Sequence, residues 1–197
     1  MDDYYSKYKV NIPERQSGDW KVEKFTVSEE EAKFHNMRAT FSFSDRGRPI
    51  KPGTYTRLMR NRTVIMSDTP AEIGDHIWFM QDAIGNVLLN GLGLGVVLNG
   101  VLLKEEVEQV IVNEISEDVI QLIAHNFKDK RVTINHANAF TWKPDGVRFN
   151  FIWHDIWDNI CEDNLSEMKQ LHRKYGHYLR KPYFQGSWGR DWIEAYK

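Results

Sequence analysis

The chain has 197 residues, of which 41% are hydrophobic, and its 26 basic and 28 acidic residues give a net charge of -2. This composition provides a sizeable core and argues against a generally basic surface for nucleic acid. The single cysteine, Cys161, excludes an internal disulfide and a cysteine-based zinc site, and it fits a reducing cytoplasm. No apolar run approaches the roughly 20 residues of a membrane span. We expect a cytoplasmic protein without a metal that acts on a small molecule, not on nucleic acid or a membrane.

The first 68 residues are polar and are expected to form a small antiparallel β extension. Strand-like segments run over 20–27 and 37–43. Turn signals stand at 44–47 and 51–53, where glycine and proline occur among polar residues. Residues 1–68 are therefore expected to form a unit separate from 69–197.

A helix start follows this extension. Thr69 suits the N-cap, Pro70 suits the first helical position, and Glu72 stands at the spacing of a capping box. This pattern predicts a helix over 70–83 that leads through a glycine into the first strand of the core.

Strands alternate with helices from there to the last third of the chain. The expected strands cover 86–90, 109–114, 131–135 and 147–153. One expected helix follows the first of these strands and ends near 104, and two more begin near Ser116 and near Asn164. After Gly176 we expect a short irregular stretch and then a terminal helix over 190–196. Such alternation predicts a parallel sheet with right-handed crossovers. The expected fold class is α/β, with a truncated Rossmann-like parallel sheet behind an antiparallel extension.

A glycine motif stands where the first expected strand meets its helix. Gly91, Gly93 and Gly95 let the backbone approach a ligand closely, beside the unpaired N–H groups of a helix N-terminus. Glu114 ends the next strand, where an acid can accept hydrogen bonds from a ribose. Dinucleotide folds require Gly-x-Gly-x-x-Gly, and this chain has Val96 at the third glycine. The motif predicts a nucleoside-cofactor site, and the alternative is a plain structural turn with Glu114 as a surface charge.

This spacing resembles motif I of the class I S-adenosylmethionine (SAM)-dependent methyltransferases and of the related spermidine-synthase-like aminopropyltransferases. The resemblance covers roughly 84–160. It implies that the glycine loop passes the methionine part of SAM, that Glu114 binds the ribose hydroxyls and that Ile115 packs on adenine. Asn138 stands where the family usually has an aspartate facing the adenine amino group. Asn90, just before the glycines, belongs to the same implied cofactor site.

The end of the fourth expected strand carries a second resemblance. Asp155 and Asp158 match the Asp-x-x-Asp element of the spermidine-synthase-like enzymes. That resemblance implies that Asp155 is the general base and Asp158 an amine-binding carboxylate. In a methyltransferase, Asp155 would instead close the SAM pocket, with the acceptor above it.

Three functions remain open on this basis. The first is a SAM-dependent methyltransferase-like enzyme with an unknown acceptor, similar to small uncharacterised proteins of a type common in bacteriophages. The second is a spermidine-synthase-like aminopropyltransferase that uses decarboxylated SAM. The third is a non-catalytic nucleoside-binding or partner-binding protein.

Overall fold

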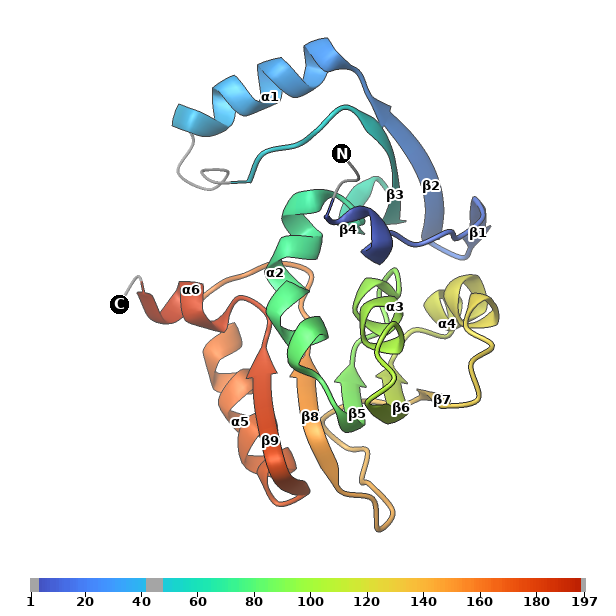
Figure 1. Cartoon of the computed structure of the whole chain (residues 1–197), viewed down its shortest axis with the longest axis vertical. Helices are drawn as coiled ribbons and strands as arrows, with labels where there is room; N and C mark the ends of the chain where they lie inside the picture. Colours follow the sequence, from blue (N-terminus) through green and yellow to red (C-terminus); the bar gives the residue numbers. More distant parts are fainter. Residues whose placement is uncertain (1–3, 42–47, 196–197) are drawn as a thin grey trace.

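The computed structural model describes residues 4–41 and 48–195. These residues form two sheets (Figure 1): a four-stranded antiparallel sheet with the order β1-β2-β3-β4, and a five-stranded parallel sheet with the order β7-β6-β5-β8-β9. The fold is α/β and Rossmann-like, with an antiparallel N-terminal extension, which confirms the predicted fold class.

The extension contains a helix that the sequence pattern did not predict. Its strands are β1 (Arg15–Ser17), β2 (Trp20–Val27), β3 (Gly53–Arg60) and β4 (Thr63–Ser67), and helix α1 (Glu29–Phe41) lies between β2 and β3. The expected strand over 37–43 is therefore wrong for residues 37–41. Residues 42 and 43 and the turn signal at 44–47 lie outside the described residues.

A capping box explains why α1 forms. The side chain of Glu31 accepts hydrogen bonds from the backbone N–H of Ser28 at 2.7 Å and from its hydroxyl at 2.8 Å. The backbone N–H of Glu31 in turn donates to the Ser28 hydroxyl at 3.2 Å. This reciprocal pair satisfies N–H groups that the first helical turn leaves open. The local start signal thus prevails over the weak apolar alternation further along.

Helix α2 (Pro70–Asp82) begins where the sequence predicted, but its cap differs. The Thr69 side chain makes no capping hydrogen bond. Glu72 reaches back to Ser67 instead, accepting from its backbone N–H at 2.6 Å and from its hydroxyl at 2.8 Å. The predicted box between Thr69 and Glu72 is therefore wrong, and Glu72 ties the end of β4 to the first turn of α2.

The parallel sheet contains all four predicted strands and one more. Its elements, with the short helices around it, are η1 (Ser6–Tyr8), β5 (Gly85–Asn90), α3 (Val96–Leu102), β6 (Val107–Glu114), α4 (Glu117–Ile123), η2 (Ala124–Asn126), β7 (Val132–His136), β8 (Phe149–His154), α5 (Asn164–Gly176), β9 (Leu179–Ser187) and α6 (Arg190–Ala195). The irregular stretch expected after Gly176 is wrong, because β9 pairs in parallel with β8. Residues 180–183 of β9 are exposed and include Pro182, a residue that edge strands tolerate.

Both faces of the parallel sheet are covered. Val87 and Leu89 of β5 point into the core cluster that contains residues of α2, α3 and α4. Leu88, between them, packs in a second cluster with Leu171 and Tyr175 of α5. Alternate residues of the same strand are thus buried on opposite faces, as a doubly covered parallel sheet requires. The carboxyl ends of the strands remain to build a site.

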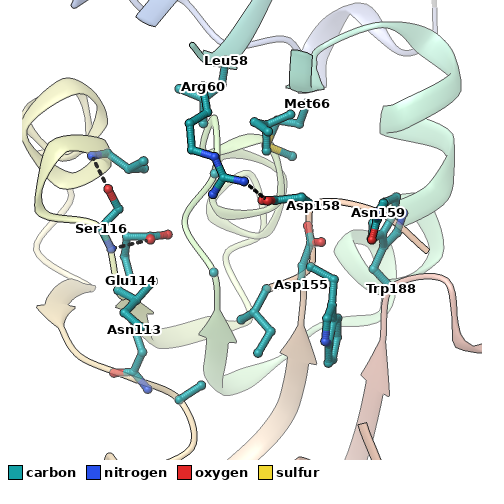
Figure 2. A pocket seen from close by; sticks show the side chains of 18 of the residues that line it. Leu58, Arg60, Met66, Asn113, Glu114, Ser116, Asp155, Asp158, Asn159 and Trp188 are labelled. Carbon is teal, nitrogen blue, oxygen red and sulfur yellow. Dashed lines mark hydrogen bonds and ion pairs between the residues drawn. The ribbon is translucent and has the colours of Figure 1, made fainter. Parts of the chain in front are cut away.

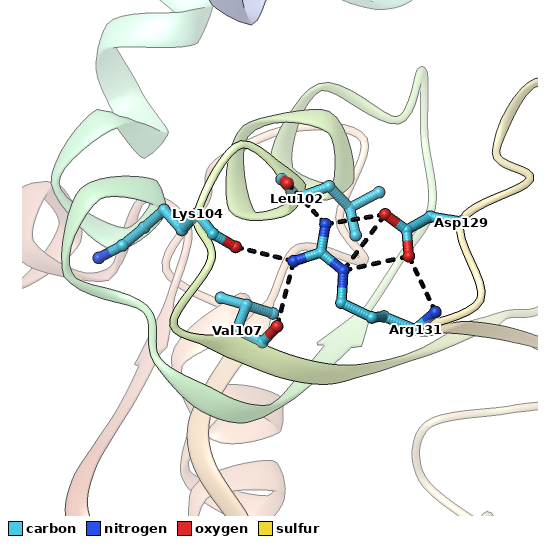
Figure 3. Close-up of polar contacts among 5 residues, drawn as sticks. All are labelled: Leu102, Lys104, Val107, Asp129 and Arg131. Carbon is cyan, nitrogen blue, oxygen red and sulfur yellow. Dashed lines mark hydrogen bonds and ion pairs between the residues drawn. The ribbon is translucent and has the colours of Figure 1, made fainter.

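Arg131 fixes the connection between α3 and β6 (Figure 3). Its guanidinium donates to the carbonyl oxygens of Leu102 and Lys104, both at 2.7 Å, and of Val107 at 3.1 Å. Asp129 holds the same guanidinium in an ion pair at 2.8 Å. Carbonyl groups at the end of a short helix are satisfied in this way, so α3 is held rigidly behind the glycine loop from which it starts.

Candidate functional site

A cavity of about 490 Å³ lies between the carboxyl edge of the parallel sheet and the antiparallel extension (Figure 2). Gly91, Glu114 and Asp155 line it from the ends of β5, β6 and β8. The extension contributes Arg60 from β3 and Met66 from β4. The two sheets therefore build one site together, at the edge where parallel sheets bind ligands.

Gly91 is the point at which the strand ends of β5 and β8 meet. Its φ of +102° lies in the region that favours glycine, and a Cβ at this position would lie 1.9 Å from the carbonyl oxygen of Asp155. Any side chain would therefore separate the glycine loop from β8. Gly95 has a φ of +80° at the N-cap of α3, and the ring of Phe127 occupies the space of its absent Cβ. Gly95 packs the loop and does not line the cavity.

Gly93 brings the loop against the extension. Its φ is +49°, and a Cβ would lie 2.3 Å from the sulfur of Met66. The backbone N–H of Leu94 donates to the same sulfur at 2.8 Å. The thioether of Met66 thus occupies one N–H of the glycine loop, at the roof of the cavity.

Glu114 connects the glycine loop to the start of the next helix. One carboxylate oxygen accepts from the backbone N–H of Leu92 at 2.9 Å, and the other accepts from Ser116 at 2.8 Å. Each oxygen has a further lone pair that can accept a hydrogen bond from a ligand in the cavity. Ile115, whose side chain is 65% exposed, lines the same wall. A buried, oriented carboxylate beside an accessible apolar side chain suits a ribose and its base.

Asn138 also lines this wall, in the turn that follows β7. Its side-chain oxygen accepts a hydrogen bond from the backbone N–H of Phe140 at 2.8 Å, which closes the turn. The oxygen keeps a second lone pair. Asn138 therefore lies at the cavity, and its side chain also stabilises the turn that contains Phe140.

Asn90 lies beneath the cavity and not in it. It is fully buried and belongs to a row of side chains that crosses four strands. Asn135 donates to Asn113 at 3.2 Å, and Asn113 donates to Asn90 at 2.9 Å. The Asn90 amide lies 2.8 Å from Nδ1 of His154, whose pKa burial holds well below its ordinary value. This row holds the strand ends in register, and Asn90 and His154 are structural members of it.

Asp155 and His76 both have strongly shifted pKa values in the cavity. The side chain of Asp155 is 18% exposed, and no hydrogen bond to its carboxylate comes from the described residues. Burial, followed by the negative charges of Glu72, Asp75 and Glu114, raises the pKa of Asp155 to about 7. Nε2 of His76 lies 3.7 Å from this carboxylate, and burial lowers the pKa of His76 to about 3. The pKa of the Asp155 carboxyl therefore lies near neutrality, beside an imidazole that is neutral at that pH.

Carboxylates dominate the wall around Asp155. Asp75 forms an ion pair with Arg48 at 2.6 Å. Asp158, 41% exposed, pairs with Arg60 across the cavity mouth (Figure 2). The lining residues that carry a carboxylate are Glu72, Asp75, Glu114, Asp155, Asp158 and Glu167. Arg60 is the one lysine or arginine among the described lining residues. An excess of negative charge in a concave site attracts cations.

The structure brings most of the predicted site residues together. Those that line the cavity are Gly91, Gly93, Glu114, Ile115, Asn138, Asp155 and Asp158, whereas Asn90 and Gly95 do not line it. Sequence reasoning missed His76 and Met66. The spacing of Glu72, Asp75 and His76, at i, i+3 and i+4 of a helix, signals one shared face and would have located the first of these.

No protein-family model matches the chain, and no curated protein matches it in sequence. Solved structures do. The spermidine synthase from Thermotoga maritima superposes with a TM-score of 0.50 at 16% identity, over 89% of this chain and 55% of that one. The chain is therefore similar in fold to this spermidine synthase.

Two methyltransferases illustrate the same likeness. The enzyme from Streptomyces caelestis matches with a TM-score of 0.46 at 18% identity, over 58% of this chain and 47% of that one. The plantazolicin methyltransferase in complex with S-adenosylhomocysteine (SAH) matches with a TM-score of 0.43 at 15% identity, over 62% and 46%. The chain thus spans about half of each of these proteins, and at such identities the likeness concerns the fold. Across the described residues, no helix is both long and apolar enough to cross a bilayer.

Proposed function

We propose that this chain binds an S-adenosyl donor in the cavity and transfers a group from it to an amine. The observation that carries the proposal is the meeting of two walls at Gly91. On one side lies the glycine loop with Glu114, and on the other lies Asp155, whose pKa stands at about 7. The first wall suits a nucleoside and the second suits a cationic nucleophile that must lose a proton.

The donor wall fits the nucleoside in three respects. The carboxylate of Glu114 retains acceptor capacity for the ribose hydroxyls while two backbone N–H groups hold it in place. Ile115 and Phe140 offer apolar surface for the base, and Asn138 stands beside them. Gly91 leaves the backbone bare where the chain of the donor would pass. A bound donor would supply an electrophilic carbon on a sulfonium, so positioning of the acceptor is the main task of the protein.

The acceptor wall suits an ammonium group. The lining contains six carboxylate side chains against one arginine, an excess that attracts a cation, and Asp155 lies among them. An amine attacks only as the free base, so the ammonium must first give a proton to an acceptor. Above pH 7 the carboxylate of Asp155 is ionised and takes that proton, after which the nitrogen lone pair is free to form the new bond. The neutral His76, 3.7 Å away, limits where the Asp155 carboxylate can turn.

Methyl transfer from SAM is the first candidate reaction, and aminopropyl transfer from decarboxylated SAM is the second. The second candidate is favoured by Met66, because its sulfur already takes the N–H of Leu94 that a donor carboxylate would otherwise use. Glu72 and Asp75 would repel such a carboxylate as well. A non-catalytic nucleoside-binding role is the alternative to both.

The test is a transfer assay with mass-spectrometric readout. The protein is incubated with SAM or decarboxylated SAM and a panel of mono-, di- and polyamines. Methylated or aminopropylated amine, absent with the isosteric Asp155→Asn variant, supports the proposal and selects the reaction. Binding of SAH without any product would identify a non-catalytic binder and overturn the transferase proposal.

A further inference from the structure

The net charge of -2 is distributed unevenly over the molecule. The segments 140–150 and 173–182 together contain six lysines and arginines and a single acidic residue, Asp145. The first segment leads into β8, and the second joins the end of α5 to the start of β9. Figure 1 shows both at the end of the parallel sheet that lies away from the antiparallel extension. We call these six residues the basic end: Lys143, Arg148, Arg173, Lys174, Arg180 and Lys181.

Two arginines connect the segments into one surface. A guanidinium N–H of Arg148 donates to the carbonyl oxygen of His177 at 3.2 Å. Nε of Arg180 donates to the side-chain oxygen of Asn150 at 2.9 Å. Each of these bonds uses only part of a guanidinium group, which has five N–H donors. Both groups are therefore held in place and keep donors for a ligand.

The crowding of positive charge at the basic end opposes folding. Burial, followed by the positive charge of Lys143, lowers the pKa of Lys174, so the two ammonium groups repel each other. The dipole of α5 favours Arg173 and Lys174 in its last turn, but it does not account for the cations that precede β8 or begin β9.

Ion pairs do not relieve this crowding. Within residues 4–41 and 48–195, Arg180 is the one member of the basic end with an ion-pair partner. That partner is Glu108 at 3.6 Å, and the two side chains are 44% and 69% exposed, so water screens the pair. A bound anion would supply the compensation that the chain itself lacks.

The side chains of the basic end favour an extended chain of phosphates as that anion. Lys174 is half-buried and the other five side chains are exposed. Three of the six are arginines, whose planar guanidinium groups bind phosphate through two parallel hydrogen bonds. Neither segment exposes a large apolar side chain that could anchor the protein in a bilayer. Cations from separate segments also exceed what one small anion would need.

We propose that the basic end binds the phosphate backbone of a nucleic acid without reading its sequence. Each lysine or arginine that meets a phosphate releases counterions, so the affinity falls steeply with salt. The cavity at the opposite edge of the sheet, with its six carboxylates and one arginine, repels the same polyanion. The nucleic acid therefore approaches from the basic end. This proposal does not rest on the transfer reaction, and either can fail without the other.

Fluorescence anisotropy of a labelled oligonucleotide, as a single strand and as a duplex, tests the proposal with the full chain. We expect a dissociation constant between about 1 and 100 µM at physiological salt for at least one of the two forms. The double variant Lys143→Glu/Arg173→Glu is expected to bind at least tenfold more weakly. Its slope of log affinity against log salt should be shallower by about 0.7 to 0.9 for each lost contact.

The variant Lys24→Glu/Lys33→Glu is the matched control, because it changes the net charge equally at two exposed lysines of the extension. It is expected to bind like wild type. A wild-type protein that binds neither form of the oligonucleotide overturns the proposal. Equal losses in the two double variants do so as well, because they would show that only the net charge matters.

Lys143→Gln provides a milder test that does not introduce an acid. It is expected to weaken binding several-fold without lowering the melting temperature, because it relieves the repulsion between Lys143 and Lys174. Unchanged affinity in this variant contradicts the proposal, even where the double variant fails to fold.

Two competitors test the nature of the anion. Poly-glutamate and vesicles that contain phosphatidylglycerol are each added at the same concentration of negative charge as the oligonucleotide. We expect both to displace it poorly. Displacement by poly-glutamate would identify an acidic protein as the partner, and displacement by the vesicles would identify a membrane surface. Either result overturns the assignment to nucleic acid.

Discussion

The two walls of the cavity each contain a carboxylate, and the two carboxylates differ in their hydrogen bonding. Glu114, at the end of β6, accepts a backbone hydrogen bond on each oxygen. Asp155, just after the end of β8, receives none from the described residues, and burial, followed by the negative charges of three other carboxylates, raises its pKa to about 7. The first carboxylate is compensated and oriented, as a binding group is. The second is destabilised in its charged form, as a base is.

This difference shows what each wall contributes. A carboxylate held by two N–H groups stays ionised and presents fixed acceptors to a ligand. A carboxylate without donors is available to take a proton from whatever enters beside it. Gly91 joins the two walls, because its backbone lies directly against the carbonyl of Asp155. The predictions that follow alter the junction, then each wall, and last the mouth of the cavity.

Gly91→Ala is expected to have the largest effect. The added methyl group meets the Asp155 carbonyl at 1.9 Å and the residue has a φ of +102°, so the walls must separate. Strain and overpacking together predict a loss of about 3 kcal/mol or more in the free energy of unfolding, measured by urea denaturation.

Gly146→Ala is the matched control for that substitution. Its φ is +74°, and no atom lies within 4 Å of the position of its Cβ. Only the left-handed backbone is penalised there, by about 1 kcal/mol. Equal losses for the two variants would show that the junction between the walls is not tight, contrary to the geometry described here.

Asp155→Asn is expected to change both the transfer rate and the pH dependence of stability, which are measured separately. Loss of the base is expected to lower the transfer rate about 10²- to 10⁴-fold. The folded-state pKa of about 7 exceeds the ordinary value of 3.8, so the folded protein holds this proton more tightly than the unfolded chain does. The stability that Asp155 contributes is therefore present in acid and is lost as pH rises through 7.

Because asparagine does not titrate, the variant should gain stability relative to wild type between about pH 4 and pH 7. The shift corresponds to at most about 4 kcal/mol, at 1.36 kcal/mol per pKa unit. Denaturation at a series of pH values measures this difference. A difference that stays flat would show that the pKa of Asp155 is not shifted, and one that decreases as pH rises would show that its folded-state pKa is lowered; either result contradicts the raised pKa.

Glu114→Gln is expected to weaken donor binding and to lose one of the two backbone hydrogen bonds that Glu114 accepts from Leu92 and Ser116, because an amide NH2 group cannot accept a hydrogen bond. The amide keeps one acceptor oxygen but lacks the charge that strengthens hydrogen bonds to the ribose, a loss of about 3 kcal/mol, or more than 100-fold in affinity for SAH. Fluorescence of Trp157 and Trp188, which line the cavity, reports binding. Glu117→Gln, the same change on α4 outside the cavity, should bind like wild type. A similar loss in both variants would contradict a specific role for Glu114.

Arg60→Ala is expected to have the smallest effect. The ion pair between Arg60 and Asp158 is 45% and 41% exposed, so water and salt screen it. Its removal should change the free energy of unfolding by less than about 1 kcal/mol, and by less still at high salt. A loss of several kcal/mol in urea denaturation would mean that the mouth of the cavity holds the two sheets together.

Local patterns were sufficient to place the glycine loop and Glu114 beside each other. The glycine loop directly follows one strand in the sequence and Glu114 ends the next one. The alternation of strands and helices places the ends of these strands at one edge of the sheet. Asp155 was found for the same reason. This part of the site required no information beyond the order of the strands.

The remaining features depend on contacts that spacing does not encode. Met66 reaches the glycine loop only because the extension folds over the cavity, and the raised pKa of Asp155 depends on carboxylates from α2. Strand β9 escaped prediction because an exposed edge strand with a proline lacks the apolar signal of a buried one. Helix α1 escaped because its capping box lies in a polar stretch that resembled a hairpin.

Calorimetric titration of the wild-type protein with SAH, decarboxylated SAM and NAD tests the central claim most directly. Binding of SAH or decarboxylated SAM with a micromolar dissociation constant, weakened by Glu114→Gln and absent with NAD, is the result we predict. A folded wild-type protein that binds neither S-adenosyl compound would contradict the account, and the glycine loop would then be only a turn between β5 and α3.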